Sequence, residues 1–154
     1  HICWPAEIQS KYPYTDDGSF QPQTDMGWLD PISTMTFVAA CTETLRLGST
    51  VLILPYRMPV QTAKQIASLD VLSGGRAILG VGVGWMAEEA AILNMPWDQR
   101  GKRADEQLEI FRRLFTEAEP SFDGEFYSLP TARRSRRRVG RGAAGVRSHR
   151  PRPG

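Results

Sequence analysis

The sequence predicts an α/β fold with parallel strands, and three observations lead to this class. Two apolar runs, Thr50–Leu54 and Ala77–Val83, have the length and composition of buried strands. One helical segment, from Pro59 to about Leu72, lies between them and is followed by Gly74-Gly75. Proline in a first helical turn and glycine just past a helix end are the usual boundary residues. A strand, a crossover helix and a second strand make a parallel βαβ unit.

The residues before the first strand divide into a loop and a helix. Residues 1–30 are rich in Pro, Asp, Gly and aromatic side chains, which predicts a long irregular loop of the kind that is often functional. Asp30 is the predicted N-cap of a helix with Pro31 at its first position, ending near Thr44. Its expected apolar face consists of Ile32, Met35, Val38 and Ala39.

Two helices and a hairpin are predicted after the second strand. A short helix at about Ala87–Leu93 ends before Pro96, and Asp98 is the expected cap of a longer helix that ends near Glu117. Ser121–Leu129 has the pattern of a hairpin with Asp123-Gly124 as its turn. The buried faces of the two long helices are expected to consist of Ala63, Ile66, Leu69, Leu108, Phe111, Leu114 and Phe115. On the solvent-exposed side of the later helix, Glu109 and Arg113 are expected to form an ion pair.

Charge divides the chain into two parts. The whole chain of 154 residues carries a net charge of +2, yet residues 1–130 hold all 17 acidic and only 10 basic residues, for a net charge of −7. Residues 131–154 hold nine arginines and no acidic residue. We therefore expect a folded domain over 1–130 and a disordered Arg-rich tail over 131–154. Because Arg, Gly, Ala and Pro dominate out-of-frame reading of GC-rich DNA, we interpret this tail as the product of a shifted reading frame.

Composition limits the class of protein. No apolar run of about 18 residues and no secretory segment is present in the sequence, which argues against a membrane protein. Cys3 and Cys41 have no metal-ligand spacing, and reduced thiols favour a cytoplasmic protein. A length of 154 residues is too short for a complete (β/α)8 barrel, which needs roughly 200–250.

The second strand ends in Gly80, Gly82 and Gly84, where no side chain separates the backbone from a neighbour. Ligands of parallel α/β folds bind at the carboxyl ends of strands, so this is the expected site. Residues 82–87 match the dinucleotide fingerprint G-x-G-x-x-G/A, but Asp105, at the spacing of its acidic partner, lies in a helical pattern. The glycines are therefore interpreted either as room for a flat ligand or as close packing of the strand and a helix without a ligand.

Several motifs of residues 1–130 are specific. They are GSTVLILPYR, P-V-x-x-A-K-Q, SLDVLSGGR and LGVGVGW, preceded by YPYTDDG and WLDPISTMTFVAACTETLRLG and followed by RGKRADEQLEIFRRLF and SFDGEFYSLP. Together they resemble the bacterial luciferase-like monooxygenase family, and most closely its branch that uses the deazaflavin coenzyme F420. The resemblance covers residues 1–130. It implies a partial (β/α)8 TIM barrel holding about strands 3 and 4 with their flanking helices, the other strands lying before His1 and after Pro130.

The resemblance also implies an activity and a cofactor. The expected activity is hydride transfer to or from a small organic substrate, or its oxygenation, with coenzyme F420 or, alternatively, FMN. Family members usually form homodimers, so a homodimer is a possible partner state. Activity of this chain is expected to be impaired by truncation. An inactive gene remnant and a basic-tailed nucleic-acid-binding protein are the alternatives, although no aromatic residue interleaves the nine arginines for base stacking.

The resemblance assigns site residues. His1 falls where the family has an Asp-His pair beside the reactive ring, and it is the predicted catalytic residue. Thr50 and Val51 match a pair that often carries a cis peptide bond behind the ring, although Thr-Val is also an ordinary strand dipeptide. The strand end and Trp85, which can wall the pocket or serve as a core residue, complete the predicted cofactor-binding set: Thr50, Val51, Gly82, Val83, Gly84 and Trp85.

Four further charged residues have simpler interpretations. Glu88 and Glu89 open a helix, where the helix dipole favours acidic side chains. Arg57 and Arg76 could bind phosphate, but a structural or solvated role is the simpler interpretation. The sequence contains no Walker loop, no Ser/His/Asp set and no metal-ligand cluster.

Overall fold

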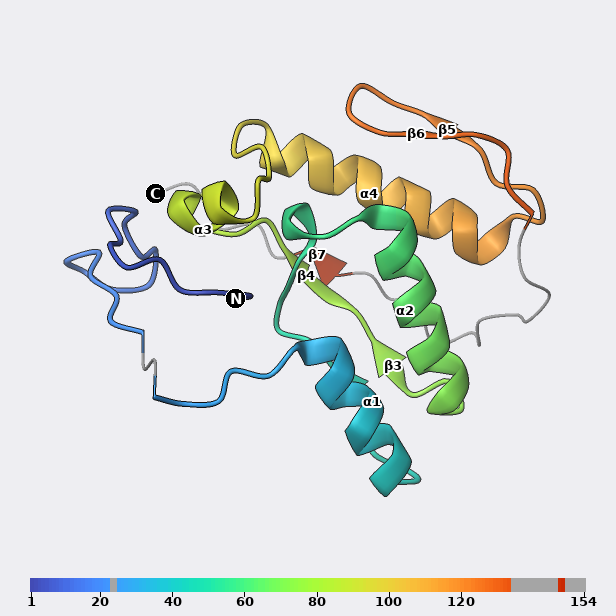
Figure 1. The fold of residues 1–154 in the computed structure, drawn as a ribbon. Coiled ribbons are helices and arrows are strands. Elements are labelled where there is room, and N and C mark those ends of the chain that lie inside the picture. The colour runs from blue at the N-terminus through green and yellow to red at the C-terminus, as the bar shows by residue number, and fades with distance from the viewer. Residues whose placement is uncertain (23–24, 134–146, 149–154) are drawn as a thin grey trace.

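The computed structural model describes residues 1–22, 25–133 and 147–148 (Figure 1). Its helices lie along a narrow set of parallel strands, and α2 packs between α1 and α4. The bounds of the helices are α1 Pro31–Cys41, α2 Pro59–Leu72, α3 Ala87–Ile92 and α4 Arg100–Thr116. The fold is α/β, as predicted, and the strands in the described part of the chain do not close into a barrel.

The strands of the structure are shorter than predicted. Of the first predicted strand, only β2 (Leu52–Ile53) forms, and β1 (Leu47–Gly48) lies before it. The second predicted strand is divided into β3 (Ala77–Ile78) and β4 (Gly80–Gly82). Strand β1 pairs in parallel with β3, and β2 pairs in parallel with β4, with Leu52 opposite Val81. Helix α2 connects β2 to β3 along the chain, so the parallel strands are joined by a crossover helix. This confirms the predicted βαβ unit.

The boundaries of the first predicted strand, Thr50–Leu54, were wrong. Residues 49–51 separate β1 from β2, and the Thr50-Val51 peptide bond is cis, as the family resemblance implies. Leu54 already belongs to a 3-10 helix, η1 (Leu54–Tyr56). Proline inside this short helix cannot donate to a strand ladder, which explains why strand pairing stops at Ile53.

The hydrophobic core lies between the strands and the helices. Its main cluster joins both strands to three helices through Ile32, Leu52, Leu54, Ala63, Ile66, Leu79, Val81, Ala104 and Phe111. A second cluster, Met35, Ala39, Leu47, Leu69 and Ala77, fills the space between α1, α2 and the β1–β3 pair. The predicted helix faces are confirmed, with Leu108, Leu114 and Phe115 partly buried against the main cluster.

The predicted helix boundaries are correct except at two ends. Asp30 caps α1 by accepting from the Ser33 amide at 2.9 Å, but α1 ends at Cys41, before the predicted Thr44. Asp98 does not cap α4: the N-cap is Gln99, in the left-handed region at φ 58°, and its side chain makes no capping bond. On the wet side of α4, Arg113 Nε donates to Glu109 at 2.7 Å as predicted.

The hairpin forms with a longer turn than predicted. Strand β5 (Phe122–Asp123) pairs antiparallel with β6 (Ser128–Leu129), and Phe122 lies opposite Leu129. Residues 124–127 connect them, with the Gly124 amide donating to the Tyr127 carbonyl at 2.9 Å, so Asp123-Gly124 alone is not the turn. The carboxylate of Glu106 holds this turn by accepting from the amides of residues 125–127.

The predicted tail contributes one described element. Strand β7 (Arg147–Ser148) pairs in parallel with β4, and Arg147 lies opposite Gly80. Residues 134–146 and 149–154 lie outside the described residues, so the predicted disorder of 131–154 stays a prediction there. None of the helices in the described part of the chain has the length and apolar content to span a membrane.

Arg76 is a structural residue. Its guanidinium donates five hydrogen bonds, to Ser73, Ala39, Leu45 and both the carbonyl and hydroxyl of Thr42. These acceptors come from the end of α1, the loop before β1 and the end of α2. The phosphate-binding interpretation of Arg76 therefore has no support, because the guanidinium is occupied by the backbone around it.

The glycines of β4 let the segment 49–51 lie directly on the strand. A Cβ at Gly82 would come within 2.6 Å of Val51 Cγ2, and one at Gly80 would collide with the Ser49 carbonyl oxygen. Both distances are shorter than normal van der Waals contact. Close packing thus accounts for both glycines, although the packing partner is the neighbouring segment and not a helix.

We expect Gly82→Ala to destabilise the chain by about 1–3 kcal/mol, because the added methyl group displaces the β-branched Val51 side chain. The free energy of unfolding from urea denaturation measures this. Gly101→Ala is the matched control: nothing lies within 4 Å of its added Cβ, and alanine favours the helix it occupies. Equal stability of Gly82→Ala and wild type would contradict the packing argument.

Candidate active site

The candidate site lies where β2 and β4 end. Because Ile53 pairs with Gly82, the carboxyl ends of these parallel strands lie side by side. An open pocket adjoins this edge, and its lining residues are His1, Ile2, Pro31, Val51, Leu52, Ile53, Tyr56 and Arg57. The pocket therefore lies at the strand ends, as predicted, but none of Gly80, Gly82 and Gly84 lines it.

Of the seven predicted site residues, two line this pocket and three lie next to residues that line it. His1 and Val51 line the pocket. Gly82 packs against Val51, and a Cβ at Gly84 would contact Ile53 and Tyr56, which also line it. The ring centroid of Trp85 is 5.8 Å from that of His1.

The other two predicted site residues, Thr50 and Val83, do not line the pocket. Thr50 is exposed and adjoins the pocket only through its cis peptide bond to Val51. Val83 packs against the main hydrophobic cluster instead of lining the pocket. Neither residue belongs to a strand: Thr50 lies between β1 and β2, and Val83 follows the end of β4.

Trp85 packs among aromatic side chains of the N-terminal loop. Its ring centroid lies 5.0 Å from that of Tyr12 and 5.2 Å from that of Phe20, both in edge-on arrangements. His1 is held in the same group, with its ring 4.4 Å from that of Trp4. Both interpretations of Trp85 thus remain compatible with its position, since it joins the loop and adjoins His1.

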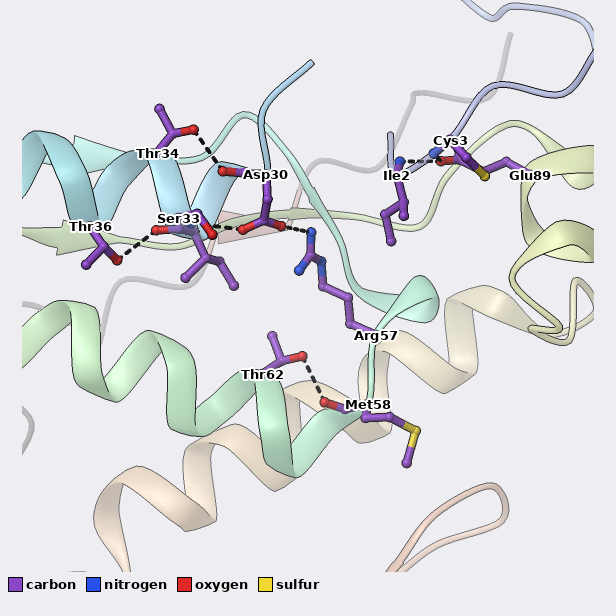
Figure 2. Close-up of polar contacts among 11 residues, drawn as sticks. Ile2, Cys3, Asp30, Ser33, Thr34, Thr36, Arg57, Met58, Thr62 and Glu89 are labelled. Atoms are coloured by element: carbon purple, nitrogen blue, oxygen red, sulfur yellow. Dashed lines mark hydrogen bonds and ion pairs between the residues drawn. The ribbon is translucent and has the colours of Figure 1, made fainter. Parts of the chain in front are cut away.

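Sequence reasoning missed the role of Glu89. Its side chain is fully buried, and its carboxylate accepts from His1 Nδ1 at 2.5 Å, from the Ile2 amide at 2.5 Å and from the Cys3 amide at 3.2 Å. Figure 2 shows the contact of the Ile2 amide with Glu89. Adjacent acidic residues after a glycine-rich strand are a sequence signal for helix N-termini in general, and only burial distinguishes this one.

Glu88 holds the next part of the same loop. Its carboxylate accepts from the Gln9 amide at 2.9 Å, and from the amide and hydroxyl of Ser10 at 2.9 and 2.7 Å. Desolvation raises the pKa of Glu88, but the hydrogen bonds from Ser10 and Gln9 outweigh it and hold that pKa below its ordinary value. Glu88 and Glu89 together fasten residues 1–10 to the first turn of α3.

Tyr56 and Arg57 support the opposite wall of the pocket. The Tyr56 hydroxyl donates to the Met86 carbonyl at 2.8 Å, and desolvation raises the pKa of Tyr56 far above its ordinary value, so the phenol stays protonated. Arg57 pairs with Asp30 at 2.7 Å, which joins the pocket to the start of α1 (Figure 2). Desolvation raises the pKa of Asp30, but hydrogen bonds from the Ser33 amide and Arg57 produce a net lowering.

The side chains around the pocket can bind an organic molecule and take part in acid–base chemistry. Within the described ranges, no group of three or more His, Cys, Asp or Glu side chains could hold a metal ion. The pocket combines apolar side chains with one imidazole, one phenol and one paired guanidinium. Such a lining can bind a flat, partly apolar molecule and offer it a hydrogen bond or a proton.

Comparison with known families identifies this chain's relatives. The family model described as luciferase-like monooxygenase matches residues 6–151, which is most of the chain. The chain belongs to this family.

Curated relatives agree with this assignment. An uncharacterised protein of Mycobacterium bovis is 40% identical over 129 residues, which cover 84% of this chain and 45% of the relative. The F420-dependent glucose-6-phosphate dehydrogenase of Amycolatopsis mediterranei is 31% identical over 125 residues, covering 79% of this chain and 35% of the enzyme. The chain thus spans less than half the length of these relatives.

Solved structures share the fold. The monooxygenase RslO1 from Streptomyces bottropensis superposes with a TM-score of 0.72 at 26% identity, covering 77% of this chain and 36% of that one. The oxygenating constituent of 3,6-diketocamphane monooxygenase from Pseudomonas putida, solved in complex with FMN, has a TM-score of 0.60 at 18% identity, covering 69% and 29%. Relatives therefore include proteins that use F420 and proteins that bind FMN, and they act on small molecules.

The Glu88 contacts predict a loss of loop docking in acid. A lowered folded-state pKa means that the stabilisation is present above the ordinary value of 4.5 and is lost as the pH falls through the folded value. We expect amide-exchange protection of Gln9 and Ser10 in the wild type to decrease on acidification from pH 6 to pH 3. In E88Q we expect weaker protection with a smaller change.

The matched control is E109Q, which removes a carboxylate that pairs with Arg112 and Arg113, far along α4 from the loop. It should leave the protection of Gln9 and Ser10 unchanged. Wild-type protection factors that are the same at pH 3 and pH 6 would show that Glu88 does not dock the loop through its charge.

Proposed function

We propose that this chain carries the cofactor-facing strands of a luciferase-like oxidoreductase or monooxygenase, and that its cofactor is coenzyme F420, with FMN as the alternative. One observation carries the proposal: an imidazole, a phenol and apolar side chains converge on the joined carboxyl ends of two parallel strands. This is the ligand-binding end of a parallel α/β fold. The proposed substrate is a small organic molecule.

The residues present fit the flat ring of a deazaflavin or flavin. Val51 is 45% exposed and stands on the pocket side of the glycine strand, so its side chain is free to support one face of a ring. Ile53 extends this apolar wall. When bound, the cofactor supplies hydride transfer or, for a flavin, oxygen chemistry.

This chain's own residues would bind, orient and exclude water. We propose that Thr50, Val51, Gly82, Gly84 and Trp85 form the cofactor wall, and that Val83 supports it from the core. His1 would accept or donate a proton at Nε2, since Nδ1 is already directed to Glu89. The aromatic rings of Tyr12 and Phe20 around Trp85 would keep water from that side of the site.

We propose F420 before FMN as the cofactor because the F420-dependent relative is more similar in sequence to this chain than the FMN-bound structure is. The F420-dependent relative aligns over 79% of this chain at 31% identity. The FMN-bound structure is 18% identical, and its similarity supports the fold alone. A homodimer and a cytoplasmic location also stay predictions, based on the family resemblance and on cysteine usage.

Cofactor binding is the property to test on this chain. We expect the fluorescence of F420 to change on titration with the chain, and we expect W85A to raise the dissociation constant about two- to tenfold, since one aromatic contact contributes roughly 0.5–1.5 kcal/mol. F37A is the matched control, because Phe37 is 72% exposed on α1 and is not among the pocket-lining residues.

Parallel titration with FMN ranks the two cofactors. Tighter binding of FMN would replace F420 in the proposal. No fluorescence change with either compound at high concentrations of folded chain would contradict the proposed function and favour the alternative of an inactive remnant. Equal weakening by W85A and F37A would exclude a specific role for Trp85.

A further inference from the structure

The strongest unassigned feature of the chain is the buried carboxylate of Glu89. Its side chain has no exposed surface, and three donors surround it: His1 Nδ1 and the amides of Ile2 and Cys3. All three belong to one short segment, which lies 86 to 88 positions away in the sequence. A buried carboxylate needs such donors, and here the donors include the predicted catalytic side chain.

The contact with His1 is specific to one ring nitrogen. A neutral imidazole carries its proton on one nitrogen and a lone pair on the other, and the partner of one nitrogen determines the role of the other. A carboxylate accepts hydrogen bonds only, so Nδ1 must be the protonated nitrogen. Nε2 then holds the lone pair, on a ring that lines the pocket.

We propose that Glu89 is a positioning residue that holds His1 in the Nδ1–H tautomer and leaves Nε2 as the proton acceptor of the pocket. The role of His1 in catalysis rests on the proposed function, but its tautomer does not require a cofactor. The hydrogen bonds from the Ile2 and Cys3 amides hold the backbone of the segment beside the carboxylate, so that only side-chain rotation can move the imidazole away from it.

The surrounding rings restrict rotation of the imidazole. Trp4 lies on it at 4.4 Å with an interplanar angle of 32°, and Trp85 meets it edge-on at 5.8 Å. Phe20 lies beyond at 6.4 Å. A ring flip that exchanged the two nitrogens would have to displace these neighbours as well as the short bond to Glu89.

A role for Glu89 in backbone docking alone makes a different prediction. The Ile2 and Cys3 amides would then suffice, and the imidazole would keep the Nε2–H form that a free histidine side chain favours. The tautomer of His1 thus separates positioning from docking. Loss of stability on substitution would not separate them, because either role contributes to it.

The test is nitrogen-15 NMR of the histidine ring in the whole chain, released from a cleavable fusion so that His1 is its first residue. His149→Gln leaves a single imidazole to observe. At a pH at which the ring is neutral, we expect the Nδ1 and Nε2 shifts to show mainly the Nδ1–H form. A mainly Nε2–H ring in the folded wild type would overturn the proposal.

Two variants of neighbouring residues complete the test. In Glu89→Met, a side chain of similar length without an oxygen acceptor, we expect the excess of the Nδ1–H form to be lost, whereas E88Q, which removes a carboxylate that contacts Gln9 and Ser10 instead, should retain it. Retention of the Nδ1–H form in a folded Glu89→Met chain would also overturn the proposal. If Glu89→Met does not fold, as judged by circular dichroism, the wild-type tautomer still decides.

The result of the tautomer experiment can be distinguished from the result of the cofactor-binding experiment. A chain that binds neither F420 nor FMN but shows the Nδ1–H ring contradicts the proposed function and supports the positioning role. A chain that binds F420 with an Nε2–H ring supports the function and overturns the positioning role.

Discussion

The close approach of residues 49–51 to β4 is the constraint on which the candidate site depends. Glycine at 80 and 82 leaves room for the Ser49 carbonyl and the Val51 side chain, so β2 can pair with β4 immediately afterwards. This pairing brings the two strand ends to one edge and places η1 beside the start of α3, where Tyr56 bonds to the Met86 carbonyl. A larger side chain in β4 would separate these walls before any ligand bound.

Carboxylates on the helices fix the irregular segments of the chain by accepting hydrogen bonds from their backbone amides. Loops leave amide groups without strand or helix partners, and unpaired buried amides are costly. Glu89 and Glu88 satisfy such amides in residues 1–10, and Glu106 satisfies three in the hairpin turn. The same chemistry therefore fixes both the loop over the site and the hairpin beyond α4, and each carboxylate acts on a segment distant in sequence.

The sequence predicted elements well and long-range contacts poorly. Apolar periodicity and boundary residues identified α2, the βαβ unit and the Asp30 cap, because these depend on neighbours a few positions away. The N-cap of α4 is Gln99 and not the predicted Asp98, because the residue before the helix adopts a left-handed backbone conformation. A pattern of side chains does not reveal such a conformation. Glu89 was assigned to the helix dipole because a first-turn acid has the same local pattern whether it is exposed or buried. The family resemblance, and not periodicity, predicted the cis bond at Thr50-Val51.

These contacts also explain why the proposed site can be studied on this chain. The wall at Val51, the imidazole of His1 and the carboxylate that orients it all lie within residues 1–89, and each is fixed by contacts inside that range. Preorganisation of a site requires that its side chains be held by their own packing and hydrogen bonds. Because Glu89 joins the helix after β4 to the beginning of the long N-terminal loop, the local geometry follows from two adjacent strand–helix units and the loop across them. The proposed cofactor binding and the histidine tautomer can therefore both be tested on this segment.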